Sequence, residues 1–221
     1  MAERSKCSIL VFAKAPIVGE VKTRLIPRLS PEQACELYRR MLRHTLNAAS
    51  RADLGAIALW CAAEIEHPYF ISLQQEFDLE LKIQAYGDLG VKMQSALQDA
   101  LHRSECAILI GGDCPSIDAT YLRDAAASLT ESAPLVLGPA LDGGYGLIGA
   151  REVAPDIFND VPWGSATVME TTRRILMGKA LGWRELAPIW DVDRPEDLAR
   201  LLADDQWNHL TANLPQENLA A

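Results

Sequence analysis

The sequence feature that most constrains the fold is a continuous apolar run in the middle of the chain. Ala107–Ile110 carries no polar side chain, and Gly111, Gly112 and Asp113 follow it directly. A short apolar run bounded by turn residues is typical of a buried central strand in a parallel sheet. Such strands end at a crevice above the sheet, where ligands bind. The run therefore predicts an α/β domain with a functional edge at Asp113.

The residues after this predicted strand suit a cation site. Gly111 and Gly112 let the backbone approach a ligand closely, and Asp113 would present a carboxylate, which is a ligand for Mg²⁺ or Mn²⁺. The alternative is that Asp113 is a turn residue that only helps to cap the helix beginning near Asp118. This stretch alone does not separate the two interpretations.

Strand and helix patterns alternate along the rest of the chain, which predicts a parallel sheet with helices on its faces. The expected strands are 8–13, 54–62, 107–111, 134–138, 145–150 and 183–186, with a short one at 81–85. The expected helices are 31–49, 69–75, 88–103, 119–128 and 168–177, with a last helix starting at 195. No repeat or linker interrupts the pattern, so we expect one domain over residues 1–221, with a frayed C-terminal tail from about 204.

Composition narrows the function classes. The formal net charge of −9 argues against a nucleic-acid partner, although a few local bases could still hold a small anion. No apolar run reaches membrane-spanning length and no signal peptide is visible, so we expect a cytoplasmic protein without a membrane span. The five scattered cysteines form no CxxC pair, which argues against zinc or a disulfide framework.

A basic loop, Lys14–Leu25, follows the first predicted strand. Lys14, Lys22 and Arg24 lie in it, and Gly19 supplies a flexible position. A strand followed by a glycine-containing basic loop is a plausible phosphate cradle, although no Walker motif is present. The alternative is an ordinary solvated loop. In an acidic chain, bases gathered at a strand end favour nucleotide binding.

Two later stretches carry further candidates. Asp142, Gly143 and Gly144 form either a tight hairpin turn or a contact with a substrate. Trp163 either packs in the core or offers a flat surface for a substrate ring.

Near the end of the chain, Asp191 and Asp193 alternate in a strand-like stretch, which would point both side chains to one face. Pro195 then begins a helix, so Asp193 could also be a structural cap or turn residue.

Taken in order, several motifs resemble the small bacterial family called rSAM/selenodomain-associated transferase 1, which is classed with the GT-A nucleotide-diphospho-sugar transferases. The resemblance spans about residues 8–203. Its motifs are FAKAP–GEVKTRL, GDLGVKM, LIGGDCPS, LGPALDGGYGLIG, VPWGSATV and WDVDRPEDL.

The resemblance implies a three-layer α/β/α sandwich with a mostly parallel, Rossmann-like sheet and a nucleotide over its first half. It implies that Asp113 holds a divalent metal, Mg²⁺ or Mn²⁺, and that Asp193 is a second ligand. The basic loop with Lys14 and Arg24 corresponds to a nucleotide-binding signature, although it lacks the glycine pair of sugar-phosphate nucleotidyltransferases. A second departure is Gly112, where the family usually has Ser or Thr.

The expected function is a metal-dependent transferase that uses a nucleotide-activated donor. The preferred hypothesis is a glycosyltransferase that moves a sugar from a nucleoside diphosphate sugar to a small-molecule acceptor, with Asp142 or Asp191 as base. One alternative is a guanylyltransferase-like nucleotidylyltransferase that joins a nucleoside triphosphate to a phosphorylated acceptor, where Asp142 would only position the acceptor. Another alternative is a nucleotide-binding protein without catalysis. The sequence leaves the base, the sugar, the acceptor and the oligomeric state open.

Overall fold

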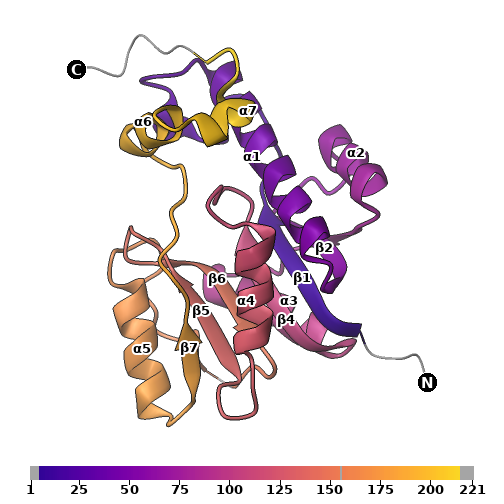
Figure 1. The fold of residues 1–221 in the computed structure, drawn as a ribbon, viewed down its shortest axis with the longest axis vertical. Coiled ribbons are helices and arrows are strands. Elements are labelled where there is room, and N and C mark those ends of the chain that lie inside the picture. The colour runs from indigo at the N-terminus through magenta and orange to yellow at the C-terminus, as the bar shows by residue number, and fades with distance from the viewer. Residues whose placement is uncertain (1–4, 155, 215–221) are drawn as a thin grey trace.

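The computed structural model describes residues 5–154 and 156–214, and in them one mixed sheet forms the centre of the molecule (Figure 1). Its order is β3-β2-β1-β4-β6-β5-β7, in which β6 runs antiparallel to both neighbours and the other pairs are parallel. The strands are β1 (Ser5–Ala13), β2 (Gly55–Cys61), β3 (Glu80–Ile83), β4 (Ser104–Gly111), β5 (Leu135–Pro139), β6 (Tyr145–Ala150) and β7 (Trp183–Glu185).

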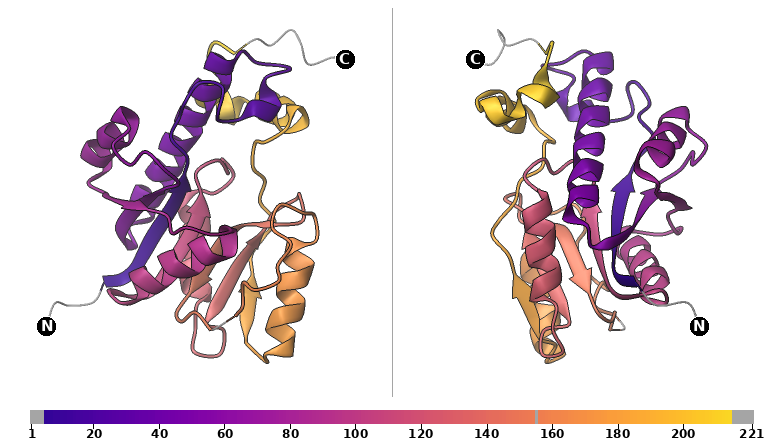
Figure 2. Two further views of the ribbon diagram at one scale, coloured as in Figure 1. Left: turned by 180° about the vertical axis from the view of Figure 1, so that it is seen from behind. Right: turned by 45° about the vertical axis from the view of Figure 1, so that its right-hand side comes forward.

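Helices cover both faces of this sheet and make three layers (Figure 2). The α-helices are α1 (Pro31–Ala52), α2 (Pro68–Phe77), α3 (Leu89–Leu101), α4 (Ala119–Ser128), α5 (Val168–Gly178), α6 (Pro195–Leu202) and α7 (Asn208–Thr211). Two 3₁₀ turns are η1 (Thr23–Leu25) and η2 (Asp205–Trp207). One buried cluster joins the sheet to α1, α2 and α4, and a second joins the opposite face to α3 and α5. The predicted three-layer, mostly parallel fold is confirmed.

The central strand is β4, as its apolar run predicts. Ile108 and Ile110 are fully buried, and β4 lies between β1 and β6. Phe12 pairs with Gly111, and the amide of Gly112 donates to the Phe12 carbonyl at 3.1 Å. The two strands therefore end side by side, which places the residues after Gly112 at the carboxyl edge of the sheet.

Helix starts follow the sequence signals. Ser30 and Gln33 form a capping box at the start of α1, with bonds of 2.9 and 3.2 Å. Asp118 caps α4 by accepting from the Tyr121 amide at 2.7 Å. Because Asp118 fills the capping position itself, the cap interpretation of Asp113 is wrong.

The C-terminal segment is more ordered than expected. Up to residue 214 the chain forms η2 and α7, and Leu210 and Leu214 are buried in a third core with α6 and the first turns of α1. The expectation of a frayed tail from 204 is therefore wrong for residues 205–214, because isolated leucines among polar neighbours find an apolar surface. The part of the expected tail from Pro215 lies outside the described residues. No helix in the described ranges is long and apolar enough to cross a bilayer.

Candidate active site

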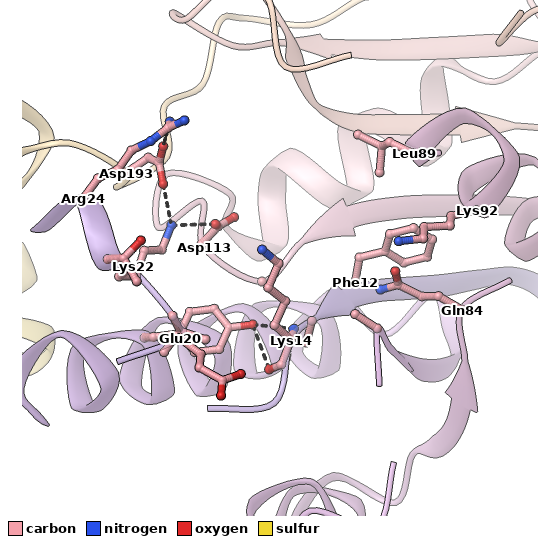
Figure 3. Close-up of a pocket in the computed structure, with 16 residues that line it drawn as sticks. Phe12, Lys14, Glu20, Lys22, Arg24, Gln84, Leu89, Lys92, Asp113 and Asp193 are labelled. Atoms are coloured by element: carbon pink, nitrogen blue, oxygen red, sulfur yellow. Dashed lines mark hydrogen bonds and ion pairs between the residues drawn. The ribbon is translucent and has the colours of Figure 1, made fainter. Parts of the chain in front are cut away.

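Two cavities open at the carboxyl edge of the sheet, and both are lined by Asp113. The first, of about 550 Å³, lies over the end of β1 between the η1 region and α3 (Figure 3). The second, of about 270 Å³, lies over β4 and β6. Phe12 and Leu89 line both cavities, so the two spaces adjoin.

The predicted site residues divide between these cavities. Those on the first cavity are Lys14, Lys22, Arg24, Gly112, Asp113 and Asp193. Those on the second are Gly111, Asp113, Asp142, Gly144, Trp163 and Asp191. Gly19 and Gly143 line neither cavity within the part of the chain that the structure describes.

Lys22 is tightly constrained in the first cavity. Its backbone has φ 50°, a left-handed conformation that is uncommon for residues other than glycine, and its side chain is only 5% exposed. Its ammonium Nζ lies 2.7 Å from Asp113 Oδ2 and 3.7 Å from Asp193 Oδ1. Burial lowers the pKa of Lys22, but the carboxylate of Asp113, followed by those of Asp193 and Asp191, more than offsets this, so the pKa is raised overall.

Asp193 comes from the far end of the chain and completes this charged group. Its Oδ2 accepts from Arg24 Nη1 at 2.5 Å (Figure 3). Asp193 does not cap α6: Arg194 is at the N-cap, and the Asp197 carboxylate accepts from the amides of both Asp193 and Arg194. The structural-cap alternative for Asp193 is therefore wrong.

Asp191 lies on the side of Asp113 that faces the second cavity. The amide of Val192 donates to the Asp113 carbonyl at 3.2 Å, which ties this segment to the end of β4. Residues 190–193 form no regular strand, so Asp191 and Asp193 line different cavities instead of sharing one face. Burial, with the charge of Asp113 next, raises the pKa of Asp191 to about 6.

The Asp142 segment joins β5 to β6 as the predicted hairpin turn. Asp142 Oδ1 accepts from the Gly144 amide at 2.9 Å, and Asp142 still lines the second cavity. Gly143 has φ +90°, and a Cβ there would lie 2.1 Å from the Ala166 carbonyl oxygen. Gly143 therefore serves the close packing of two backbone segments.

Trp163 packs against two aromatic rings and also lines the second cavity. Its ring packs edge-on against Tyr145 at a centroid distance of 6.1 Å, and at a tilt of 45° against Phe158 at 6.3 Å. It also lines the second cavity, where its aromatic surface borders the space for a ligand.

Two glycines of the predicted site have structural explanations. A Cβ at Gly112 would lie 2.7 Å from Leu42 Cδ1, so a larger residue would require the buried Leu42 side chain of α1 to shift. Gly19 has φ +82°, and a Cβ there would meet no atom within 4 Å, so this glycine serves the turn.

A known protein family matches the middle of the chain. Residues 45–165 match the family described as an uncharacterized protein conserved in bacteria (DUF2064). The chain belongs to this DUF2064 family. A comparison with curated proteins found no match.

Solved structures share the fold of this DUF2064 chain. A candidate nucleotide-diphospho-sugar transferase from Desulfovibrio desulfuricans G20 is 27% identical, with 95% of each chain covered and a TM-score of 0.82. A nucleotidyl transferase from Methanothermobacter is 12% identical, with 89% of this chain and 95% of that chain covered and a TM-score of 0.56. The 4-diphosphocytidyl-2C-methyl-D-erythritol synthase from Anaerococcus prevotii DSM 20548 is 11% identical, with 89% and 96% covered and a TM-score of 0.59. The fold is thus that of nucleotide-diphospho-sugar transferases and nucleotidyltransferases.

Sequence reasoning missed several residues of the first cavity in this DUF2064 protein. Figure 3 shows Phe12, Gln84, Leu89 and Lys92 together on the side opposite Lys22. Lys92 stands in the first turn of α3, within the GDLGVKM motif, so its place in that motif is a signal that could have identified it. Gln84 follows β3 directly, and its distance from the other candidates along the chain gave no indication that it shares their cavity.

Asp113 and Asp193 are the carboxylates that could hold a divalent ion. No group of three or more His, Cys, Asp or Glu side chains suited to a metal gathers in residues 5–154 and 156–214. Asp113 and Asp193, however, converge on one point, which the Lys22 ammonium occupies. Mg²⁺ is commonly held by one or two carboxylates together with water and substrate phosphates. The donor set of this DUF2064 protein fits such a site and does not fit an all-protein cage.

Proposed function

We propose that this protein is a glycosyltransferase that takes a sugar from a nucleoside diphosphate sugar. The observation that carries the proposal is the difference in charged side chains between the two cavities that meet at Asp113. The first cavity is bordered by four basic side chains, those of Lys14, Lys22, Arg24 and Lys92, together with the carboxylates of Glu20, Asp113 and Asp193. The second is bordered by three carboxylates, and none of its lining residues in the described chain is Lys, Arg or His.

The first cavity suits the nucleoside diphosphate part of a donor. Lys22 and Arg24 would neutralise the phosphates beside the end of β4, because charge-assisted bonds to phosphate are the strong ones. Phe12, Gln84 and Leu89 lie on the opposite side and offer an apolar and hydrogen-bonding surface for the base (Figure 3). A divalent ion held by Asp113 and Asp193 would add positive charge to the diphosphate.

The second cavity suits an uncharged, hydroxyl-rich group. Carboxylates accept hydrogen bonds from sugar hydroxyls, and Trp163 and Tyr145 border the space with aromatic surface. A phosphorylated acceptor would instead place its negative charge beside Asp142 and Asp191 without a basic side chain to compensate it. This charge pattern favours glycosyl transfer over nucleotidyl transfer.

In the proposed reaction, an acceptor hydroxyl oxygen attacks the anomeric carbon of the sugar. The bond from that carbon to the diphosphate oxygen breaks, and the nucleoside diphosphate leaves with the electron pair. Asp142 or Asp191 takes the proton of the hydroxyl, because both carboxylates line the cavity in which the acceptor would lie. Lys22 and Arg24 stabilise the negative charge of the leaving group.

The second candidate function is nucleotidyl transfer, which the fold shared with nucleotidyltransferases favours. In that reaction an acceptor phosphate attacks the α-phosphate of a nucleoside triphosphate, and pyrophosphate leaves. The two reactions therefore release different products, a nucleoside diphosphate or pyrophosphate.

The test has a binding step and a turnover step. A thermal-shift panel of nucleoside triphosphates and nucleotide sugars, with and without Mn²⁺, identifies the donor, since a ligand of the native state raises Tm. Turnover with that donor is then measured with neutral and with phosphorylated acceptors. We expect nucleoside diphosphate release with neutral acceptors, and a turnover loss in Asp142→Asn or Asp191→Asn with donor binding retained. Pyrophosphate release with phosphorylated acceptors would favour nucleotidyl transfer, and tight binding without turnover would favour a non-catalytic protein.

A further inference from the structure

The cation position between the two expected metal ligands is already filled by a side chain of the protein. Figure 3 shows the Lys22 ammonium between the carboxylates of Asp113 and Asp193. The nitrogen lies 2.7 Å from one and 3.7 Å from the other. A divalent ion that used both carboxylates would have to take nearly the same position, and its charge would repel the ammonium if Lys22 stayed there.

Two further observations indicate that Lys22 is held at this point and does not reach it by chance. Its side chain is 5% exposed, whereas surface lysines place their ammonium in water. Its backbone is in the left-handed region, and strain of this kind persists where the surrounding structure imposes it, often at functional sites. Val21 and Leu25, on either side, are buried in the third core and fix the segment that carries Lys22.

We propose that Lys22 is the resident cation of this site and excludes divalent metal from the free protein. Metal enters only when the Lys22 ammonium leaves Asp113. The diphosphate of a bound nucleoside diphosphate, which would be an anion in the same cavity, is the group that draws the ammonium away. Nucleotide and metal therefore bind together, and the free protein binds neither Mg²⁺ nor Mn²⁺ tightly. This inference rests on the proposed binding of a nucleoside diphosphate in the first cavity, and it does not depend on which group the enzyme transfers.

Lys92 provides the matched control for this proposal. It borders the same cavity and carries the same charge, but it lies on the opposite side (Figure 3). If Lys22 excludes metal by its position, Lys22→Met will open the site and Lys92→Met will not. If general positive charge in the cavity excludes metal, the two variants will behave alike.

The experiment is a titration of Mn²⁺ without nucleotide, followed by the EPR signal of the free ion. We expect Lys22→Met to bind Mn²⁺ at least about ten-fold more tightly than the wild type, and Lys92→Met and Lys22→Arg to resemble the wild type. Adding Asp113→Asn to Lys22→Met should abolish the gained binding, which locates it. Lys22→Gly is the second variant if Lys22→Met does not fold, because glycine accepts the left-handed backbone and adds no metal ligand.

Equal Mn²⁺ affinity in the wild type and the folded Lys22 variants would overturn the proposal, as would an equal gain in Lys92→Met. Neither donor nor acceptor enters this titration, so a failure to detect sugar transfer leaves its result unaffected.

Discussion

Asp113→Asn tests how strongly the site depends on the ion pair at its centre. The substitution keeps the shape of the side chain and removes its charge. It leaves the Lys22 ammonium 5% exposed and without the carboxylate that lies 2.7 Å away. We expect the fold to persist but the protein to become less stable, because a buried charge without its partner is costly.

The magnitude follows from the exposure of the two partners. Breaking a fully buried ion pair by removing one member costs about 3–5 kcal/mol. Asp113 is 32% exposed, so water screens part of this pair, and Asp193 remains 3.7 Å from the ammonium. We therefore expect a loss of about 2 kcal/mol in the free energy of unfolding, reduced from the buried value by this screening. That loss corresponds to a fall in Tm of about 4–8 °C for a chain of this size.

Removing the other partner of the ion pair, Lys22, should cost less stability. Lys22→Met removes the buried ammonium and leaves carboxylates that reach solvent, so we expect a loss of about 1 kcal/mol or less. The double variant should then be more stable than the sum of the two losses predicts, with a coupling of about 1–2 kcal/mol.

Urea denaturation of the four proteins, without metal or nucleotide, measures this cycle. Additive losses would refute the argument that Lys22 depends on Asp113. An Asp113→Asn protein more stable than the wild type would show that repulsion among the carboxylates outweighs the pairing.

Three further predictions concern other parts of the molecule. Arg24→Ala should weaken binding of a nucleoside diphosphate by about 1–3 kcal/mol and leave nucleoside binding unchanged; calorimetry showing equal losses for both ligands would contradict a phosphate role. Gly143→Ala should lower the free energy of unfolding by about 2–4 kcal/mol, because a strained backbone and a backbone clash add. The control Gly19→Ala, also at positive φ but with open space around it, should lose only about 1–2 kcal/mol, and equal losses in urea melts would exclude the clash. Burial, together with the nearby His209, lowers the pKa of His44. As the pH falls below about 6.5, the unfolded chain therefore takes up a proton at His44 that the folded chain does not. The wild type should therefore lose more stability than His44→Gln between about pH 7.5 and 5.5 in denaturant melts, and parallel losses would exclude His44 as the cause.

The sheet and its helices could be predicted because their signals are local. The apolar run before Gly111 identifies the central strand, and Ser30 with Gln33 identifies the start of α1. Each of these signals lies within a few residues and can be recognised without knowledge of the rest of the chain. The alternation of the elements then restricts the architecture to a layered α/β fold.

The division of the site residues between two cavities could not be predicted, because it depends on contacts between segments that are distant in the sequence. Asp191 and Asp193 are two residues apart, but the irregular chain between them sends one carboxylate to each cavity. Alternation along a strand gave the wrong answer since no strand forms there. Lys92 was missed for a related reason: a single lysine on an amphipathic helix is ordinarily a solvated residue, and only the packing of α3 beside β1 brings it to the cavity.

The C-terminal segment shows how a distant core positions the charged group. Asp193 precedes α6, whose Leu198 and Leu201 are buried in the same cluster as Leu25 of η1. Because η1 also carries Arg24, the packing of α6 on η1 brings the Arg24 guanidinium to Asp193 without a strand or a turn linking them. The packing of this late helix thus positions Asp193 beside residues from the beginning of the chain. Its leucines hold α6 against η1, and Asp193 then contacts both Arg24 and Lys22.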